Sequence, residues 1–317
     1  MENIEIERFG VQRFSNDNSM ILFYTGFVSL AMFTAVFNYI KPVANSMNGY
    51  YYKSNEKVNE QSMVGRQRNM LLIDEFFMFL CRLTCGLKEQ DLANRFNCHL
   101  STISRKIITW ANFLYFALGS INIWPSRQQI DEKMPNSFKL LYPRTRIIID
   151  CTEIKTERPS SLALGSKCFS SYKSAYTWKG LVGIAPHGAL SFVSNLYTGS
   201  MSDVELTKLS GLIDILDSGD FIMANHDRGF VLNKVLDGTG ISINTPPFLM
   251  SQGQFTKQEV EQTQIIAKLR TYKRSVKEYH LFDSVIPLSM VGTINQLWTV
   301  ANLLTLFKGP LVKDWYK

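Results

Sequence analysis

The sequence predicts an α+β protein with a helical N-terminal half and a C-terminal half that contains a β-sheet. Two observations indicate this division. Between Met70 and Trp110, apolar residues recur with the spacing of helix faces. From Arg146 onward the chain instead has short apolar and β-branched runs, the first of which ends at Asp150. The chain has 317 residues, 45% of them hydrophobic, which is enough for two domains with substantial cores.

The N-terminal apolar segment could be either a buried or a membrane-spanning helix. Residues 20–45 are expected to be helical and to end before Pro42. Within them, the run Met20–Ile40 has 21 residues without a charge, which is long enough to cross a bilayer. It also contains Gly26 and several polar residues. We therefore expect a buried helix pair broken near Gly26 and no membrane contact, with a membrane anchor as the rival interpretation.

The remaining pattern predicts three domains: residues 1–66 (helical segment and linker), 67–143 (helix-turn-helix) and 144–317 (the half with the sheet). Residues 120–143 contain three prolines and are expected to form a loop. The other predicted elements are a helix at Met70–Leu87, two short helices within 88–110, strands at Arg146–Asp150, Thr177–Ile184, Ala189–Tyr197, Phe221–Ala224 and Ile241–Asn244, and helices at Val204–Leu216, Lys257–Lys277 and Leu288–Leu306. Pro186-His187-Gly188 is expected to join two of the strands as a hairpin.

A helix-turn-helix is predicted between Leu87 and Trp110. Leu92, Ala93 and Phe96 would form the inner face of the first helix, and Asn97-Cys98 the turn. Ile103, Ile107 and Trp110 would face inward from the second helix, which is expected to run from Leu100 to Trp110. The residues left facing outward are of types that contact bases and phosphates: Ser101, Thr102, Arg105 and Lys106. The rival interpretation is a helical hairpin that serves packing alone.

Charge and cysteine content agree with a DNA-binding protein of a reducing compartment. The net charge is +7 and the isoelectric point about 9.1, which favours nucleic acid over membrane as a partner. The five cysteines form no CxxC pair and predict neither a disulfide framework nor a structural zinc site. We expect a location in the nucleus or the cytosol, with the nucleus favoured for a protein that binds double-stranded DNA.

Two aspartates stand at the ends of predicted strands. Asp150 ends the first strand of the C-terminal half, and Asp227 follows the strand predicted at Phe221–Ala224. Carboxylates on neighbouring strand ends are suited to a divalent metal such as Mg²⁺, which prefers oxygen ligands. Aspartate is also common in turns, so these residues alone leave a turn-capping role open.

The order of several short motifs resembles that of DDE-superfamily endonucleases, and in particular PIF/Harbinger-like transposases with an N-terminal helix-turn-helix. The resemblance extends from about Asn16 to Leu311. Besides the helix-turn-helix, the motifs that carry it are Phe23-Tyr24-Thr25-Gly26-Phe27, Trp124-Pro125-Ser126-Arg127, Ile149-Asp150-Cys151-Thr152-Glu153-Ile154, Tyr172-Lys173, Lys179-Gly180-Leu181-Val182-Gly183-Ile184, Gly199-Ser200-Met201-Ser202-Asp203, Asp227-Arg228-Gly229-Phe230 and Pro246-Pro247-Phe248.

The resemblance implies a mixed-sheet, RNase H-like fold and a metal-dependent endonuclease that cuts DNA phosphodiesters. It implies that Asp150 and Asp227 are catalytic and hold Mg²⁺ or Mn²⁺, and a homo-oligomer is compatible with it. The sequence departs from the family at the third acid, where Lys273 replaces a glutamate, and a cation there repels metal. It also has two extra residues, Asn225-His226, before Asp227.

These departures leave two interpretations: an active nuclease, or an inactive or decayed transposase copy that retains DNA binding. Glu278 and Glu261 are the candidates for a replacement third acid, although their helical phase differs from that of the lost position. Arg270 and Arg274 lie on the same predicted basic helix and are candidate DNA contacts. For Glu153 a structural salt bridge and a metal role are both open, and Asp203 is expected to cap the helix that follows it.

Overall fold

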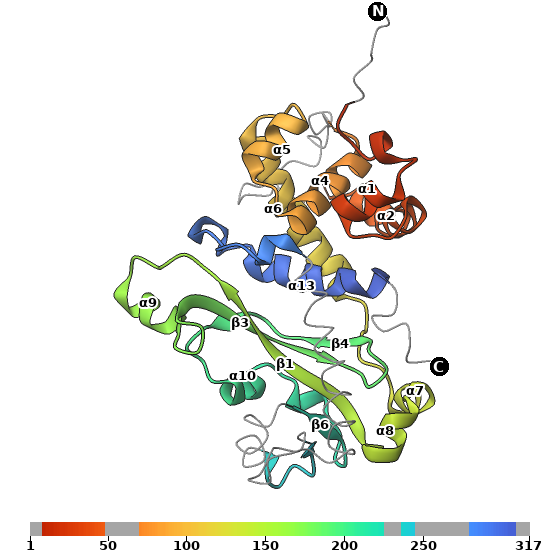
Figure 1. The fold of residues 1–317 in the computed structure, drawn as a ribbon, viewed down its shortest axis with the longest axis vertical. Helices are drawn as coiled ribbons and strands as arrows, with labels where there is room; N and C mark the ends of the chain where they lie inside the picture. The colour runs from red at the N-terminus through yellow and green to blue at the C-terminus, as the bar shows by residue number, and fades with distance from the viewer. Residues whose placement is uncertain (1–7, 48–69, 225–235, 245–278, 309–317) are drawn as a thin grey trace, which may run out of the picture. The chain divides into compact units, whose positions relative to one another are not determined.

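The computed structural model describes residues 8–47, 70–224, 236–244 and 279–308. The chain forms two compact units (Figure 1). The first comprises Met1–Ile121 and Glu278–Ser284, and the second comprises Asn122–Lys277 and Val285–Lys317. The expected domains divide at 143/144 instead. The segment 122–143 thus groups with the sheet, and the short segment 278–284 returns to the helical unit.

The first unit is helical. Its elements are η1 (Gln12–Phe14), α1 (Asn18–Thr25), α2 (Leu30–Ala44), α4 (Leu72–Cys85), α5 (Glu89–Arg95), α6 (Leu100–Gly119) and η4 (His280–Phe282). An aromatic core joins three of these helices. The Phe76 ring on α4 stacks on Phe33 of α2 at 5.4 Å and lies 5.4 Å from the Trp110 ring of α6.

The N-terminal helices form the broken pair that the sequence predicts. Gly26 adopts the left-handed conformation, with φ of 76°, and ends α1. Phe27 and Phe33 are buried, as expected of a pair packed against other helices. In the described part of the chain, no single helix is long and apolar enough to span a membrane, although α1 and α2, bent by 49°, meet the length and composition criteria as a pair.

Helix α2 continues through Pro42, so the expectation that it ends before this proline is wrong. Proline lacks an amide N–H and therefore removes one helical hydrogen bond. Pro42 lies in the last turn of α2, where this loss affects little helix beyond it. The Asn45 N–H still donates to Lys41 O at 3.0 Å.

The second unit is a mixed sheet with short helices. Its strands are β1 (Thr145–Lys155), β2 (Phe169–Ser170), β3 (Ala175–Ile184), β4 (Leu190–Val193), β5 (Tyr197–Thr198), β6 (Phe221–Met223) and β7 (Ser242–Asn244). Its helices are α7 (Arg127–Lys133), α8 (Asn136–Leu141), α9 (Leu162–Cys168), α10 (Asp203–Leu209), η3 (Ile213–Ile215), η5 (Leu288–Met290), α13 (Ile294–Leu304) and η6 (Thr305–Lys308).

The strand order is β2-β3-β1-β6-β7, and β4 and β5 also pair with β3. Strands β1, β3 and β4 are antiparallel neighbours, whereas β6 and β7 run parallel to β1. The predicted hairpin between β3 and β4 is present, and Gly188 adopts a φ of 89° in its turn. A helical N-terminal region followed by this curled mixed sheet confirms the predicted α+β class and is consistent with an RNase H-like nuclease fold.

The two faces of the sheet have different partners. Side chains alternate along a strand, so Ile149 and Cys151 share one face of β1, where they pack with Leu206 in a buried cluster. On the other face, Gly180 of β3 lies against Trp298 of α13. A Cβ atom at Gly180 would come within 2.8 Å of the Trp298 ring, so glycine is required for this close approach.

Several predicted elements have different bounds. Residues 120–143 are not a plain loop, because Ser126 begins α7 with a capping box and Pro135 precedes α8. The helix expected at Val204–Leu216 stops at Leu209, because Gly211 takes a φ of 79°. The last helix begins at Ile294 rather than Leu288, whereas α6 runs on to Gly119, nine residues beyond its predicted end at Trp110.

Candidate nucleic-acid interface and acidic site

Helices α5 and α6 form the predicted helix-turn-helix. The inner face of α5 is buried at Leu92, Ala93 and Phe96, as the sequence predicts. The turn is tight because Asn97 adopts a left-handed φ of 49°, a conformation that asparagine tolerates better than most residues. The Cys98 N–H then donates to Ala93 O at 2.9 Å, which closes the turn.

The second helix presents the predicted inner face. Ile103, Ile107 and Trp110 are all buried, with exposed fractions of 2% or less. Their spacing leaves Ser101 and Arg105 exposed and Thr102 half-buried on the other side of α6. A hydroxyl, a guanidinium and a second hydroxyl along the first turns of a helix are groups suited to DNA bases and phosphates.

Lys106 turns toward α4, so the expectation that its side chain faces outward is wrong. Its ammonium group donates to Glu75 Oε1 on α4, and the Lys106 side chain is only 18% exposed. Glu75 Oε2 also accepts from Trp110 Nε1 at 3.2 Å. The partner is 31 residues away in the sequence, so helical periodicity alone does not reveal it. A signal was present, however, because Glu75 falls on the apolar face of its helix, where a carboxylate requires a partner.

His99 serves as the N-cap of α6. Its Nδ1 accepts a hydrogen bond from the Ser101 N–H at 3.3 Å and lies 2.8 Å from Ser101 Oγ. The sequence shows histidine where serine or threonine is usual, and the structure assigns it the same role. A free amide of the first turn is thereby satisfied at the end of the helix that carries Ser101.

The expectation that Asp150 ends its strand is wrong, because β1 continues to pair with β3 as far as Lys155. Asp150 lies near the middle of β1, half-buried, opposite Val182 of β3. On the other side of β1, the parallel strand β6 pairs Met223 with Ile148. The Ala224 N–H donates to Asn244 O at 3.1 Å and marks the end of the described part of this strand. Strand β6 therefore ends at the level of Ile148, two residues before Asp150 on β1, and in the sequence Asp227 follows three residues after Ala224.

The other acidic-site residues predicted from the sequence lie outside the described residues. These are Asp227, Glu261, Glu278 and Lys273, together with the basic residues Arg270 and Arg274. Among the described residues there is no group of three or more histidine, cysteine or acidic side chains that could hold a metal ion. The described structure thus offers Asp150 as one carboxylate ligand, and a metal centre needs further ligands from beyond it.

Glu153 and Asp203 form a cluster around Lys179. The Lys179 ammonium lies 3.5 Å from Glu153 Oε1 and 3.2 Å from Asp203 Oδ1, and it donates to Met201 O at 2.9 Å. Thr177 Oγ1 also donates to Glu153 Oε2 at 2.9 Å. Of the two roles open for Glu153, the structure supports the salt bridge, because alternation along β1 puts its side chain on the face opposite Asp150.

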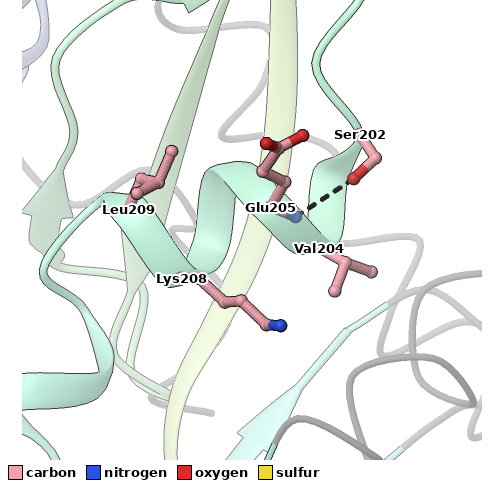
Figure 2. A pocket seen from close by; sticks show the side chains of 5 residues that line it. All are labelled: Ser202, Val204, Glu205, Lys208 and Leu209. Atoms are coloured by element: carbon pink, nitrogen blue, oxygen red, sulfur yellow. Dashed lines mark hydrogen bonds between the residues drawn. The ribbon is translucent and has the colours of Figure 1, made fainter.

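Ser202, not Asp203, caps α10. Its Oγ accepts from the Glu205 N–H at 3.1 Å (Figure 2). Asp203 is the first residue inside the helix and pairs with Lys179 instead. Figure 2 also shows an open pocket beside this helix, lined by Ser202, Val204, Glu205, Lys208 and Leu209. Because α10 packs on the Ile149 face of the sheet, this pocket is not part of the Asp150 site.

A buried arginine fixes the start of β1. Arg146 lies with its guanidinium carbon 4.6 Å from the centre of the Trp124 ring, and its Nε is 3.4 Å from Asp220 Oδ2. Arg127 reaches the same carboxylate at 3.4 Å and donates to Pro143 O at 2.7 Å. Burial lowers the pKa of Arg146, and the nearby Asp220 opposes that change. The motif Trp124–Arg127 therefore ties the beginnings of β1 and β6 together.

Comparison with known families identifies the class of both parts. Residues 149–305 match the family model described as DDE superfamily endonuclease, and residues 68–120 match the helix-turn-helix of DDE superfamily endonuclease. No curated protein is similar enough to the chain to count as a relative. The fold and these matches define a protein that combines a nuclease-family domain with a helix-turn-helix. More particularly, the chain carries a DDE transposase-family endonuclease domain together with the helix-turn-helix of that superfamily, and such domains imply DNA binding and generally use divalent metal ions.

Proposed function

We propose that this chain is a transposase-derived protein, of the PIF/Harbinger-like class, that binds double-stranded DNA through α6. Ser101, Thr102 and Arg105 would contact the major groove and its phosphates. The observation that carries this proposal is the packing of α6. Its apolar side is fully buried and its amino end is capped by His99, so Ser101 and Arg105 are held outward on a fixed helix.

The second part of the proposal concerns DNA cleavage. Asp150 and Asp227 would hold Mg²⁺ or Mn²⁺, and such an ion supplies stabilisation of charge on a phosphodiester under attack. The parallel pairing of β1 with β6 supports this, because it brings the end of β6 opposite Ile148, two residues before Asp150 on the neighbouring strand. Glu261 or Glu278 would provide a third carboxylate, and Arg270 and Arg274 would contact the DNA backbone. A protein with this activity would work in the nucleus.

The alternative is an inactive copy that retains DNA binding. Lys273 stands where the family has its third acid, and a cation at that position disfavours metal. Both versions share the DNA-binding part, which is therefore tested first.

DNA binding is tested with the full chain on a mixed-sequence duplex over a range of salt concentrations. Arg105→Ala should weaken binding and reduce the slope of log K against log salt by about one, because the variant removes one cation from the DNA interface. The matched control is Lys41→Ala, which removes an exposed cation of α2. Equal effects of the two variants would contradict the role of α6.

Cleavage is tested with Mn²⁺ and DNA that carries terminal inverted repeats, using the parent chain, Asp150→Ala and Lys273→Glu. If the chain is an active nuclease, the parent should cut this DNA and Asp150→Ala should not. If the chain is a decayed copy, the parent should not cut. Lys273→Glu restores a carboxylate and should then raise Mn²⁺-dependent cutting, provided that the rest of the site is intact. Parent activity that survives Asp150→Ala would rule out Asp150 as a metal ligand.

A further inference from the structure

We propose that the arm formed by residues 155–176 is a second DNA-binding surface, separate from α6 and from the acidic site. This inference rests on the proposed function, since it assumes that the chain handles DNA. The arm comprises the end of β1, helix α9, and the tight turn between β2 and β3. In Figure 1, α9 lies at the end of the β1–β3 pair that extends beyond β6.

The arm carries an excess of positive charge on its surface. It contains four basic residues and one acid, Glu157, which leaves a net charge of 4 − 1 = +3. All four basic side chains are exposed: Lys155, Arg158, Lys167 and Lys173. Five exposed serines lie among them, at positions 160, 161, 166, 171 and 174. Lysine, arginine and serine are among the side chains that contact the phosphate backbone.

The tip of the arm exposes an aromatic ring beside a cation. Tyr172 is 83% exposed, and Lys173 Nζ lies 4.8 Å from the centre of its ring. Behind the tip, Arg158 stands over the Tyr176 ring at 5.9 Å. Exposed aromatic rings flanked by cations stack on unpaired bases while the cations hold the backbone. The tip is therefore suited to DNA whose bases are locally unpaired, as at a cleavage site or a strand end.

The arm is held in a defined shape, which a binding surface requires. At the tip, the Lys173 N–H donates to Ser170 Oγ at 3.3 Å, and Ser174 adopts a left-handed φ of 47°. At the base, the Ser200 N–H donates to Lys167 O at 3.0 Å. A Cβ atom at Gly199 would come within 2.1 Å of Thr177 Oγ1, so this glycine allows the chain to pass directly against β3. Ordering the arm on DNA would therefore cost little additional entropy.

The register of the sheet gives the reach of the arm. Asp150 and Lys155 are five residues apart on β1, or about 17 Å at the rise of a strand. The turn at Tyr172 extends roughly 10 Å further, so its tip lies up to about 27 Å from Asp150. That distance corresponds to roughly eight base pairs of B-DNA. DNA bound at the acidic site would then contact the arm through the base pairs that flank that site.

A protein partner is the rival occupant, because α9 also exposes Leu162 and Leu164. The positive charge around these leucines and the single acid in the arm favour a polyanion over an ordinary protein surface. The proposal therefore commits to DNA, and a protein partner becomes an outcome of the test.

The test uses the full chain and a mixed-sequence duplex of about 30 base pairs, longer than the estimated reach. The arm variant changes Lys155, Arg158, Lys167 and Lys173 to alanine. The matched control removes four exposed cations of the same unit by changing Lys133, Lys139, Arg144 and Lys208 to alanine. The arm variant should lower the slope of log K against log salt by roughly three, and the control by less than one. Equal slopes for the two variants would overturn the proposal.

A second measurement tests the tip. Tyr172→Ala should weaken binding to a duplex with a short unpaired stretch by roughly fivefold or more, whereas Tyr172→Phe should retain it because the ring is kept. If Tyr172→Ala and Tyr172→Phe bind the same DNA equally, the stacking role is overturned.

The outcomes separate this proposal from the function on which it rests. If Arg105→Ala has no effect while the arm variant lowers the salt slope, the role of α6 fails and the arm stands. If Arg105→Ala lowers the slope and the arm variant does not, the arm fails alone. Dissociation of an oligomer by the arm variant in sedimentation, without any change in DNA binding, would make the arm a protein interface and overturn the proposal. A parent chain that binds no DNA at low salt would overturn both.

Discussion

The Lys106 ammonium group of α6 donates to the buried Glu75 carboxylate of α4, and the same carboxylate accepts from Trp110 Nε1. The Glu75 side chain is 4% exposed, so its charge depends on these partners for stabilisation. The three residues therefore fix the rotation of α6 on α4. That rotation is what keeps Arg105 and Ser101 facing outward.

The first prediction concerns this cluster. Lys106→Met should destabilise the helical unit by about 2–3 kcal/mol, because it removes the Lys106 cation from the buried Glu75 carboxylate. Glu75→Gln should cost a similar amount, and the double variant should cost less than the sum of the two because both remove one interaction. Urea unfolding measures the three values. The control Arg105→Ala, at an exposed position, should change stability by less than about 0.5 kcal/mol. Additive effects would mean that the two residues do not interact.

The second prediction concerns the cap of α6. His99→Ala should destabilise the helical unit by about 1 kcal/mol, because the Ser101 N–H loses its acceptor at Nδ1. His99→Asp should keep most of the stability, since a carboxylate caps as well and also suits the positive end of the helix. Thermal unfolding of the three chains checks this. A cap role is wrong if the alanine and aspartate variants unfold together.

Periodicity predicted the elements whose structure depends on neighbours in the sequence. The inner faces of α5 and α6, the break at Gly26 and the hairpin at Gly188 all follow from local spacing or local backbone preference, and all are present. The helices α7 and α8 were missed because prolines also begin helices, where the missing N–H needs no partner. A cluster of prolines therefore marks the boundaries of helices rather than the absence of helix.

The errors in the site have a different cause. Helical phase predicts an outward Lys106 because its partner Glu75 is far away in the sequence, and it predicts a capping Asp203 because Lys179 lies on a distant strand. Helical phase gives the face of the helix on which a residue lies, but not which other element packs against that face. The strand that carries Asp150 could be predicted, but its length could not. Asp150 lies in the middle of β1 because pairing with β3 continues to Lys155, and that partner strand is distant in the sequence. Asp227 lies outside the described residues and stays a prediction.

The third prediction concerns the segment that returns to the helical unit. Gly86 ends α4 with a φ of +67°, and a Cβ atom there would lie 3.1 Å from the backbone of His280. Gly86→Ala should therefore be strained by its backbone and should also displace η4, with a cost of about 2 kcal/mol or more. The matched control is Gly188→Ala, which has a φ of +89° and nothing within 4 Å of the added atom. That variant should show the backbone strain alone, at about 1 kcal/mol.

Hydrogen exchange distinguishes the two glycine variants. In Gly86→Ala, the Phe282 N–H, which donates to Tyr279 O, should lose protection because η4 no longer packs closely on α4. In Gly188→Ala the same amide should keep its protection. Unchanged exchange at Phe282 in both variants would show that η4 does not depend on the approach at Gly86.

The fourth prediction follows from His187 in the β3–β4 turn. Burial lowers the pKa of His187 from its ordinary value of 6.5, and the nearby Lys133 lowers it further. The folded protein therefore favours the neutral ring, whereas the unfolded chain takes up a proton as the pH falls below about 6.5. The unfolded state then binds more protons, so the stability contributed by His187 is present above this pH and is lost as the pH falls toward the lowered value.

The free energy of unfolding of the sheet unit should accordingly decrease as the pH is lowered from about 7 to about 5, a window set by the ordinary histidine value. His187→Asn should flatten this dependence, because asparagine does not titrate and has a similar size. Lys133→Ala should reduce it in part, since it removes the second cause of the shift. His280→Asn, at an exposed histidine of the other unit, provides the control. If His187→Asn and the parent chain lose stability equally over this range, another group is responsible for the pH dependence.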